Sequence, residues 1–430
     1  MALSLVIAGC QRGARLPEKS GVGGLLMFEY SGITVMHQYS GRDYVHLRFH
    51  FGWQNPEKYS YATQRLAVEG AFVGGAKGLT ADAFASSVEA AGATLDFAAG
   101  SDGPVVMANC LKDHLDEAWA LLVRCFSLPT FEKEAYQQMR DSRIATQRAL
   151  ESDLAHLASQ AAIREAWPVL DPMKTMGGSS TDLEVVEHTT AQAAFMEMMR
   201  SKCNLRLVTV GPVDAERISD LLLDLVEVLP DGTCAGPPAT TAAPQLQRAR
   251  LIHKPHGGDF IAGIFPGPPR GSVASVNMGL VMHMVEKRLH DHLVVRDRLA
   301  SGALAQYIHA DPAYNLIQIK GRNALQCAEF TLSELRKLKA DGFSNVEVEL
   351  GKRALGARID LNYEAAPSLA AILDVTAAWN SPTISGNERL ILDKSGAKAL
   401  SALLRTYLTG ITWGIVGDTT GIDRKSLQRL

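Results

Sequence analysis

The feature that most constrains this chain is a strand-and-glycine pattern that occurs once in each half. LRLVTVGPVD at 205–214 and ITWGIVGDTTG at 411–421 each join an apolar strand to a glycine turn. Their glycines, Gly211 and Gly417, are 206 residues apart. In a chain of 430 residues, this spacing predicts a duplicated α+β unit of roughly 200 residues.

The segments before each closing strand follow a similar plan. In the first half, LLMFEYSGITVMHQYS and DYVHLRFHFGW alternate β-branched or aromatic residues with polar ones, which predicts strands. The second half opens in the same way with ARLIHKPHGGDFIAGIFPGP. Helices are predicted at 114–126, 134–167, 272–298 and 324–340. The expected fold class is α+β, with two homologous halves that each contain an antiparallel-rich sheet covered by helices.

A change in composition predicts the domain boundary. Residues 230–246, PDGTCAGPPATTAAPQL, are rich in Pro, Gly, Ala and Thr and have no hydrophobic periodicity, so we interpret them as an exposed linker. We therefore expect a first α+β domain at 24–229 and a second at 247–430. Residues 1–23 form a separate terminal segment in this division.

The terminal segment is open to two interpretations. Ile7-Ala8-Gly9-Cys10 resembles a bacterial lipoprotein cleavage box, but the apolar stretch before it is short and has no basic residue ahead of it. Arg12, Arg15 and Lys19, with no acidic residue before Glu18, resemble the remnant of a mitochondrial targeting segment. We favour the organellar interpretation.

Composition excludes several classes of function. A net charge of −3 without a long basic run gives no electrostatic basis for binding nucleic acid. No apolar run approaches the ~18 residues that a membrane span needs. The six cysteines contain no CxxC pair, so we expect neither a disulfide framework nor a zinc ribbon, and Cys110, Cys125 and Cys327 are predicted to be core residues. We expect no haem, iron–sulfur or other cofactor.

A local motif suggests a family. Residues 65–78, RLAVEGAFVGGAKG, precede the predicted helix LTADAFASSVEAAG and the strand ATLDF, and a later helix ends in LPTF at 128–131. With the two similar halves, this passage resembles the pitrilysin/insulinase family of metallopeptidases. The resemblance covers nearly the whole chain and implies the duplicated fold expected above.

The resemblance also implies where a metal would bind. In active members an HxxEH helix supplies two zinc ligands and the Glu that activates water, and a Glu further along completes the site. Alignment on the glycine pair places Arg65, Val68 and Glu69 at the HxxEH positions, and Ala145 or Thr146 near that of the distal Glu. An Arg would repel Zn²⁺ and a Val cannot deprotonate water. We therefore predict a degenerate motif, with no catalytic residue and no metal ligand.

Other histidines do not replace the lost site. His46 and His50 are four residues apart, but the alternation of their strand places them with Arg48 on one polar sheet face. His290 and His292 point in different directions on a helix. His253 and His256 flank a proline in a predicted loop with no carboxylate fixed beside them. We expect none of these groups to hold a metal.

Three roles are possible for a family member without catalytic residues or metal ligands. The one we favour is a structural core subunit, resembling core protein 2 of mitochondrial ubiquinol–cytochrome c reductase (complex III). The alanine-rich helix RIATQRALESDLAHLASQAAIREAWP, with His156, replaces the acidic metal-helix segment as in that type. This role implies a homologous second subunit, a larger membrane-associated complex and a place on the matrix side of the inner membrane.

The first alternative is the inactive partner of a bacterial heterodimeric zinc peptidase, periplasmic and lipid-anchored. Such partners often supply an Arg and a Tyr in the pattern RExxGxxY to hold the peptide. Here Arg296 begins the segment, but Ala300 and Ala303 replace the Gly and Tyr, so Tyr307 fits only with a shifted register. The second alternative is the non-catalytic subunit of the mitochondrial processing peptidase. Its flexible glycine-rich loop is missing from SVASVNMGLVMHMVEKRL, which has one glycine.

Overall fold

A computed structural model describes residues 25–168, 177–234, 243–255, 257–378, 386–425 and 427. By their contacts these residues form two compact units. The first takes its described residues from Met1–Gln147, Met173–Pro238 and Asn362–Ser385. The second takes its described residues from Arg148–Pro172, Ala239–Leu361 and Gly386–Leu430. The predicted terminal segment 1–23 and His256 lie outside the described residues.

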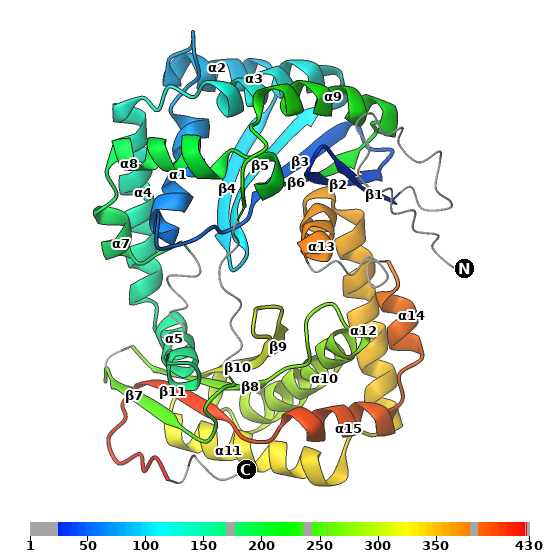
Figure 1. Cartoon of the computed structure of the whole chain (residues 1–430). Coiled ribbons are helices and arrows are strands. Elements are labelled where there is room, and N and C mark those ends of the chain that lie inside the picture. Colours follow the sequence, from blue (N-terminus) through cyan, green and yellow to red (C-terminus); the bar gives the residue numbers. More distant parts are fainter. Residues whose placement is uncertain are drawn as a thin grey trace. The chain divides into compact units, whose positions relative to one another are not determined.

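The first unit contains a sheet in the order β1-β2-β6-β3-β5-β4 (Figure 1). Strands β2 and β6 are parallel, and the other neighbours are antiparallel. The strands are β1 Leu25–Tyr30, β2 Ile33–Tyr39, β3 Tyr44–Phe51, β4 Thr94–Gly100, β5 Gly103–Leu111 and β6 Leu205–Gly211.

Helices pack a large apolar core against one face of this sheet, with Phe49 and Phe51 meeting Phe72 and Phe126 in aromatic contacts. The helices are α1 Tyr61–Val73, α2 Ala81–Ala90, α3 Leu115–Ser127, α4 Lys133–Ser152, α7 Ser180–Glu184, α8 His188–Ala194 and α9 Ala215–Val228. A π-helical turn, Phe195–Met199, follows α8, and 3-10 turns cover Lys112–His114 and Lys202–Asn204.

The second unit repeats this plan. Its sheet has the order β7-β11-β8-β10-β9, with β7 and β11 parallel and the other neighbours antiparallel. This is the order and direction of β2-β6-β3-β5-β4, and Gly211 and Gly417 end the equivalent strands β6 and β11. The predicted α+β fold with two homologous halves is therefore confirmed. The strands are β7 Ala249–His253, β8 Asp259–Pro266, β9 Ala300–Ile308, β10 Tyr314–Gly321 and β11 Thr412–Gly417.

The helices of the second unit pack around a core centred on Met282, Val285 and Trp413. They are α10 Val273–Leu289, α11 Ala324–Asp341, α12 Asn345–Glu364, α14 Glu388–Asp393 and α15 Ala397–Tyr407, and a π-helical turn, His290–Arg296, continues α10. No described helix combines the length and the apolar character that crossing a bilayer requires.

Each unit receives one helix from the other half of the sequence. Helix α13, Ala366–Ala378, packs Leu369 and Leu373 on Met36 and Val208 of the first sheet. Helix α5, Leu154–Ala166, packs on the second sheet (Figure 1). We name this reciprocal arrangement the helix exchange. The compact units are therefore a different division of the chain from the contiguous domains expected at 24–229 and 247–430.

The contact of α5 with its sheet depends on small residues. Ala158 and Ala162 recur every four residues and so lie on one face of the helix. A Cβ on Gly414 of β11 would come within 2.0 Å of the Ala158 carbonyl oxygen and 2.5 Å of the Ala162 nitrogen. The helix backbone therefore lies directly on the strand because residue 414 has no side chain.

One helix prediction is corrected. The single helix expected at 134–167 is two helices, because Asp153 interrupts it between α4 and α5. Asp153 has extended backbone angles, and its side chain accepts a hydrogen bond from the backbone N–H of His156. It is thus the N-cap of α5, and the break allows α5 to join the second unit.

Candidate functional site

The positions expected to form the degenerate zinc motif lie on α1. This helix begins after Ser60, whose side chain caps the N–H of Thr63. Val68 points into the apolar core and is fully buried. Arg65 and Glu69 are one turn apart on one face, and Arg65 Nε donates to Glu69 Oε1 at 3.0 Å.

A third residue completes this group. Arg143 of α4 donates its Nε–H to the second carboxylate oxygen of Glu69. The side chain of Glu69 is 1% exposed, whereas those of Arg65 and Arg143 are 12% and 25% exposed. We call these residues the Arg65–Glu69–Arg143 cluster.

The cluster does not fit a zinc ion. Each oxygen of its single carboxylate already binds a guanidinium group, and the net positive charge of the cluster would repel a metal ion. Within the described ranges no three His, Cys, Asp or Glu residues are grouped as possible metal ligands. No metal-dependent step is therefore derived for these residues.

The contact of Arg143 with Glu69 was not predicted from the sequence. The distal position was expected near Ala145 or Thr146, but Thr146 bonds to the Ser142 carbonyl of its own helix. Arg143, slightly earlier on α4, is the residue that reaches α1. The available signal was Glu69 itself, because a carboxylate in a mostly apolar helix is expected to be buried and then requires cationic partners.

The structure does not join the two residues expected to contact peptide. Arg296 ends the π-helical turn after α10 and is exposed. Tyr307 lies in β9 and is buried, and its hydroxyl donates to the Pro268 carbonyl oxygen at 2.8 Å. Burial raises the pKa of the Tyr307 hydroxyl. Their role in binding peptide stays a prediction.

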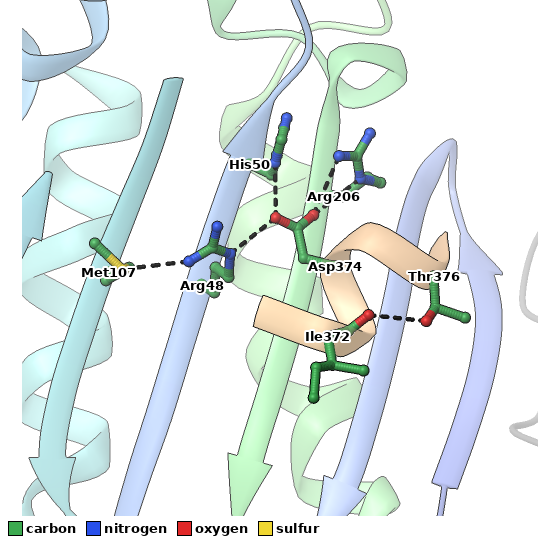
Figure 2. Close-up of polar contacts among 7 residues, drawn as sticks. All are labelled: Arg48, His50, Met107, Arg206, Ile372, Asp374 and Thr376. Carbon is green, nitrogen blue, oxygen red and sulfur yellow. Dashed lines mark hydrogen bonds and ion pairs between the residues drawn. The ribbon is translucent and has the colours of Figure 1, made fainter. Parts of the chain in front are cut away.

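A second ionic cluster holds α13 on the first sheet (Figure 2). Asp374 accepts hydrogen bonds from Arg48 Nε and His50 Nδ1, each at 2.8 Å, and from Arg206 Nε and Nη2 at 3.2 and 3.1 Å. Burial opposes ionisation of Asp374, but the charges and hydrogen bonds of these partners outweigh it and lower the carboxyl pKa. This cluster could not be predicted from local sequence patterns, because Asp374 is 324 residues from His50.

The strand alternation behind this cluster was predicted correctly. Arg48 and His50 share Asp374, and His46 bonds Asn109 of the neighbouring strand β5 at 2.6 Å. The three side chains therefore serve as polar contacts of a sheet face. This face is partly covered by α13, which the alternation alone could not reveal.

The prediction for the cysteines is correct for three core residues and wrong for one disulfide. Cys110, Cys125 and Cys327 are buried free thiols, as expected. However, Cys203 and Cys234 form a disulfide that attaches the start of the predicted linker to the chain just before β6. The pair was missed because 31 residues separate the two cysteines and no CxxC spacing marks them.

Comparisons with known proteins agree with this fold. Residues 189–355 match the family model described as peptidase M16 inactive domain. A peptidase M16 inactive domain from Pseudomonas fluorescens is 14% identical, with a TM-score of 0.79 over 93% of this chain and 99% of that chain. A protease from Helicobacter pylori is 16% identical, with a TM-score of 0.81 over 92% of this chain and 100% of that chain. The periplasmic protease PqqL from Escherichia coli is 12% identical, with a TM-score of 0.75 over 97% of this chain but 48% of that chain. No curated protein sequence matches the chain.

The duplicated sheets give the chain a metallopeptidase-like fold, and the model that matches residues 189–355 is described as an inactive domain. Residues 189–355 match an M16 family model, and the fold of the chain is similar to that of the M16 inactive domain from Pseudomonas fluorescens, in agreement with the pitrilysin-type resemblance that the motif at 65–97 predicted. The three structures named above come from bacteria. None of these findings concerns complex III or a mitochondrion, so that part of the expectation stays a prediction.

Proposed function

We propose that this chain is the non-catalytic partner subunit of a two-chain zinc peptidase in the bacterial cell envelope. The observation that carries the proposal is the Arg65–Glu69–Arg143 cluster, because two arginines bind the carboxylate on the helix where the motif alignment predicts the metal ligands of active members. A family member with this replacement contributes walls and peptide contacts, while the zinc and the water-activating Glu belong to a second chain. The model that matches residues 189–355 is described as inactive, which supports a non-catalytic role.

The lengths of the similar structures support a partner of comparable size. This chain spans 48% of PqqL, whereas almost all of the chain itself is matched. PqqL is therefore about twice as long as the part that this chain matches. In the proposed pair, a separate homologous subunit supplies the additional length.

The disulfide supports a place in the envelope. Disulfides persist in oxidising compartments such as the bacterial periplasm and are rare where cellular thiols are kept reduced. Cys203 and Cys234 are both exposed, so cellular reductants would reach the bond. A periplasmic location thus explains the bond better than the matrix side of the mitochondrial inner membrane. The core-subunit and processing-peptidase roles have no comparable observation in their favour.

The test is native isolation of the chain from its own organism under mild conditions. We expect a homologous M16 chain to co-purify, with zinc on that partner and peptidase activity only when both chains are present. As a matched control, the separated partner is assayed alone and after this chain is added back. Isolation of this chain without a homologous partner would contradict the proposal, and so would stoichiometric zinc on this chain.

A further inference from the structure

The Arg65–Glu69–Arg143 cluster has more hydrogen-bond donors than acceptors. Each guanidinium carries five N–H donors, and Glu69 accepts the Nε–H of each. Among the described residues no other hydrogen-bond acceptor contacts either guanidinium. With two cations and one carboxylate, the group keeps a net charge of +1.

The two arginine side chains, rather than Glu69, are the part of the cluster that solvent reaches. Glu69 is almost completely buried, whereas both arginine side chains are partly exposed. An anion that approaches from solvent therefore meets guanidinium groups before it meets the carboxylate. Because Glu69 binds both Nε atoms, the two guanidinium groups lie beside the same carboxylate.

Packing also restricts the two arginines. The Arg143 guanidinium lies over the ring of Phe97 in β4, 6.0 Å from its centre. A Cβ on Gly177 would approach Arg65 Cδ to 2.7 Å, so the chain at Gly177 lies against the Arg65 stem. Ordered donors lose less conformational entropy when they bind a ligand.

The Asp374 cluster shows what a closed arrangement looks like. There Arg206 gives both Nε and Nη2 to the carboxylate, and Arg48 uses Nη1 on the sulfur of Met107 in addition to its Nε bond. Helix α13 also carries the carboxylate onto that face. In the Arg65–Glu69–Arg143 cluster, only one donor of each guanidinium is used.

We infer that the Arg65–Glu69–Arg143 cluster is a binding site for a peptide carboxylate. A planar carboxylate matches the fork of a guanidinium, and a net charge of +1 suits a monoanion better than a dianion such as phosphate. The carboxylate is either the C-terminus of a peptide or an Asp or Glu side chain. This inference rests on the proposed function, in which the chain helps to hold peptides, and it gives the former metal position a new ligand.

The test uses the full-length chain and isothermal titration calorimetry with one short N-acetylated peptide in four versions. The versions combine a free or amidated C-terminus with an internal Glu or Gln, so that one version has no carboxylate. We expect the version without a carboxylate to bind roughly tenfold more weakly than the best of the others, or worse. If amidation of the C-terminus weakens binding, the carboxylate is the peptide C-terminus. If replacement of Glu by Gln weakens binding, it is the side chain.

Three variants test whether the cluster is the site. Arg65→Lys and Arg143→Lys keep a positive charge beside Glu69, and their melting temperatures check the fold. We expect each to weaken binding of the carboxylate peptide about tenfold, because Lys lacks the fork that can serve two carboxylates at once. Arg140→Lys is the matched control, since Arg140 is on the same helix, is 24% exposed and pairs with Asp141.

Two results would overturn the inference. One is that no version of the peptide binds, or that the version without a carboxylate binds as tightly as the others. The other is that the Arg65 and Arg143 variants behave like Arg140→Lys. Neither result affects the pairing test, because co-purification and zinc location do not depend on the carboxylate site.

Discussion

At Asp374 one carboxylate balances Arg48, His50 and Arg206 on the buried face of the first sheet. Removing one partner of a buried ionic group leaves uncompensated charge and costs about 3–5 kcal/mol. We therefore expect Asp374→Ala to lower the free energy of unfolding by about that amount. Urea unfolding at neutral pH measures it.

The control for this prediction lies two residues further along the same helix. Thr376→Ala removes a buried hydroxyl that bonds the Ile372 carbonyl within the same helix, and such a bond contributes about 1 kcal/mol. Figure 2 shows both sites on α13. If the two variants lose the same stability, the ionic cluster is not what holds the helix.

His37 predicts a dependence of stability on pH. Burial lowers its pKa to about 4, although nearby hydrogen bonds and Asp214 raise it. In the unfolded chain its pKa returns to the model-compound value of 6.5, so the unfolded state binds a proton first as the pH falls. Stability is therefore complete above pH 6.5 and declines towards pH 4, by on the order of 3 kcal/mol from this residue.

His37→Gln tests that sign, because Gln can keep a bond to Thr209 without titrating. Chemical unfolding at a series of pH values from neutral to mildly acidic should give a shallower decline for the variant than for the wild type. An unchanged pH profile would mean that other groups cause the acid sensitivity.

At the scale of elements, the contact between α5 and β11 predicts the effect of one methyl group. Gly414→Ala would place a Cβ inside the backbone of α5, so α5 must move away from the sheet. Forced overpacking of this kind costs typically 1–3 kcal/mol. Differential scanning calorimetry of the whole chain measures the loss.

Gly302→Ala is the matched control for the strand itself. Gly302 lies in β9 of the same sheet, and its added Cβ would have no atom within 4 Å. We expect this variant to be close to neutral or slightly stabilising. Equal losses from the two substitutions would show that strand propensity, and not the approach of α5, sets the cost.

Periodicity predicted most elements but not their partners. The strand at His46–His50, the helix at 114–126 and the paired glycines at 211 and 417 all follow from local patterns. Periodicity tells which face of a helix is apolar. It does not tell which sheet that face covers, so the helix exchange was not predicted.

The site divides in the same way. The pairing of Arg65 with Glu69 could be predicted locally, because the two residues are one helix turn apart. The other contacts could not be predicted, because they join residues far apart in the sequence. Arg143 is 74 residues from Glu69, and Asp374 is 324 residues from His50. The two cysteines of the disulfide are 31 residues apart. Contacts at such separations depend on the assembled fold.

For the whole molecule, the helix exchange predicts that neither half is stable alone. A fragment of residues 1–234 lacks α13, and a fragment of residues 243–430 lacks α5. We expect each fragment by itself to unfold without cooperativity, and the two to associate when they are expressed together. Gel filtration and urea unfolding of the single and paired fragments measure this.

Asp374→Ala in the second fragment provides the specificity control. It should weaken association, because Asp374 is the ionic contact between α13 and the sheet of the first fragment. A fragment 1–234 that unfolds cooperatively alone, as stably as in the whole chain, would show that the exchanged helix is dispensable.

The same exchange sets an order of events during synthesis. The strands of the first sheet leave the ribosome with Arg48, His50 and Arg206 in place, but Asp374 is translated later. At about 5–20 residues per second, the interval between residues 206 and 374 is roughly 8 to 34 seconds. During that time the nascent sheet carries an uncovered cationic face, so the first unit is completed only after much of the second has been made.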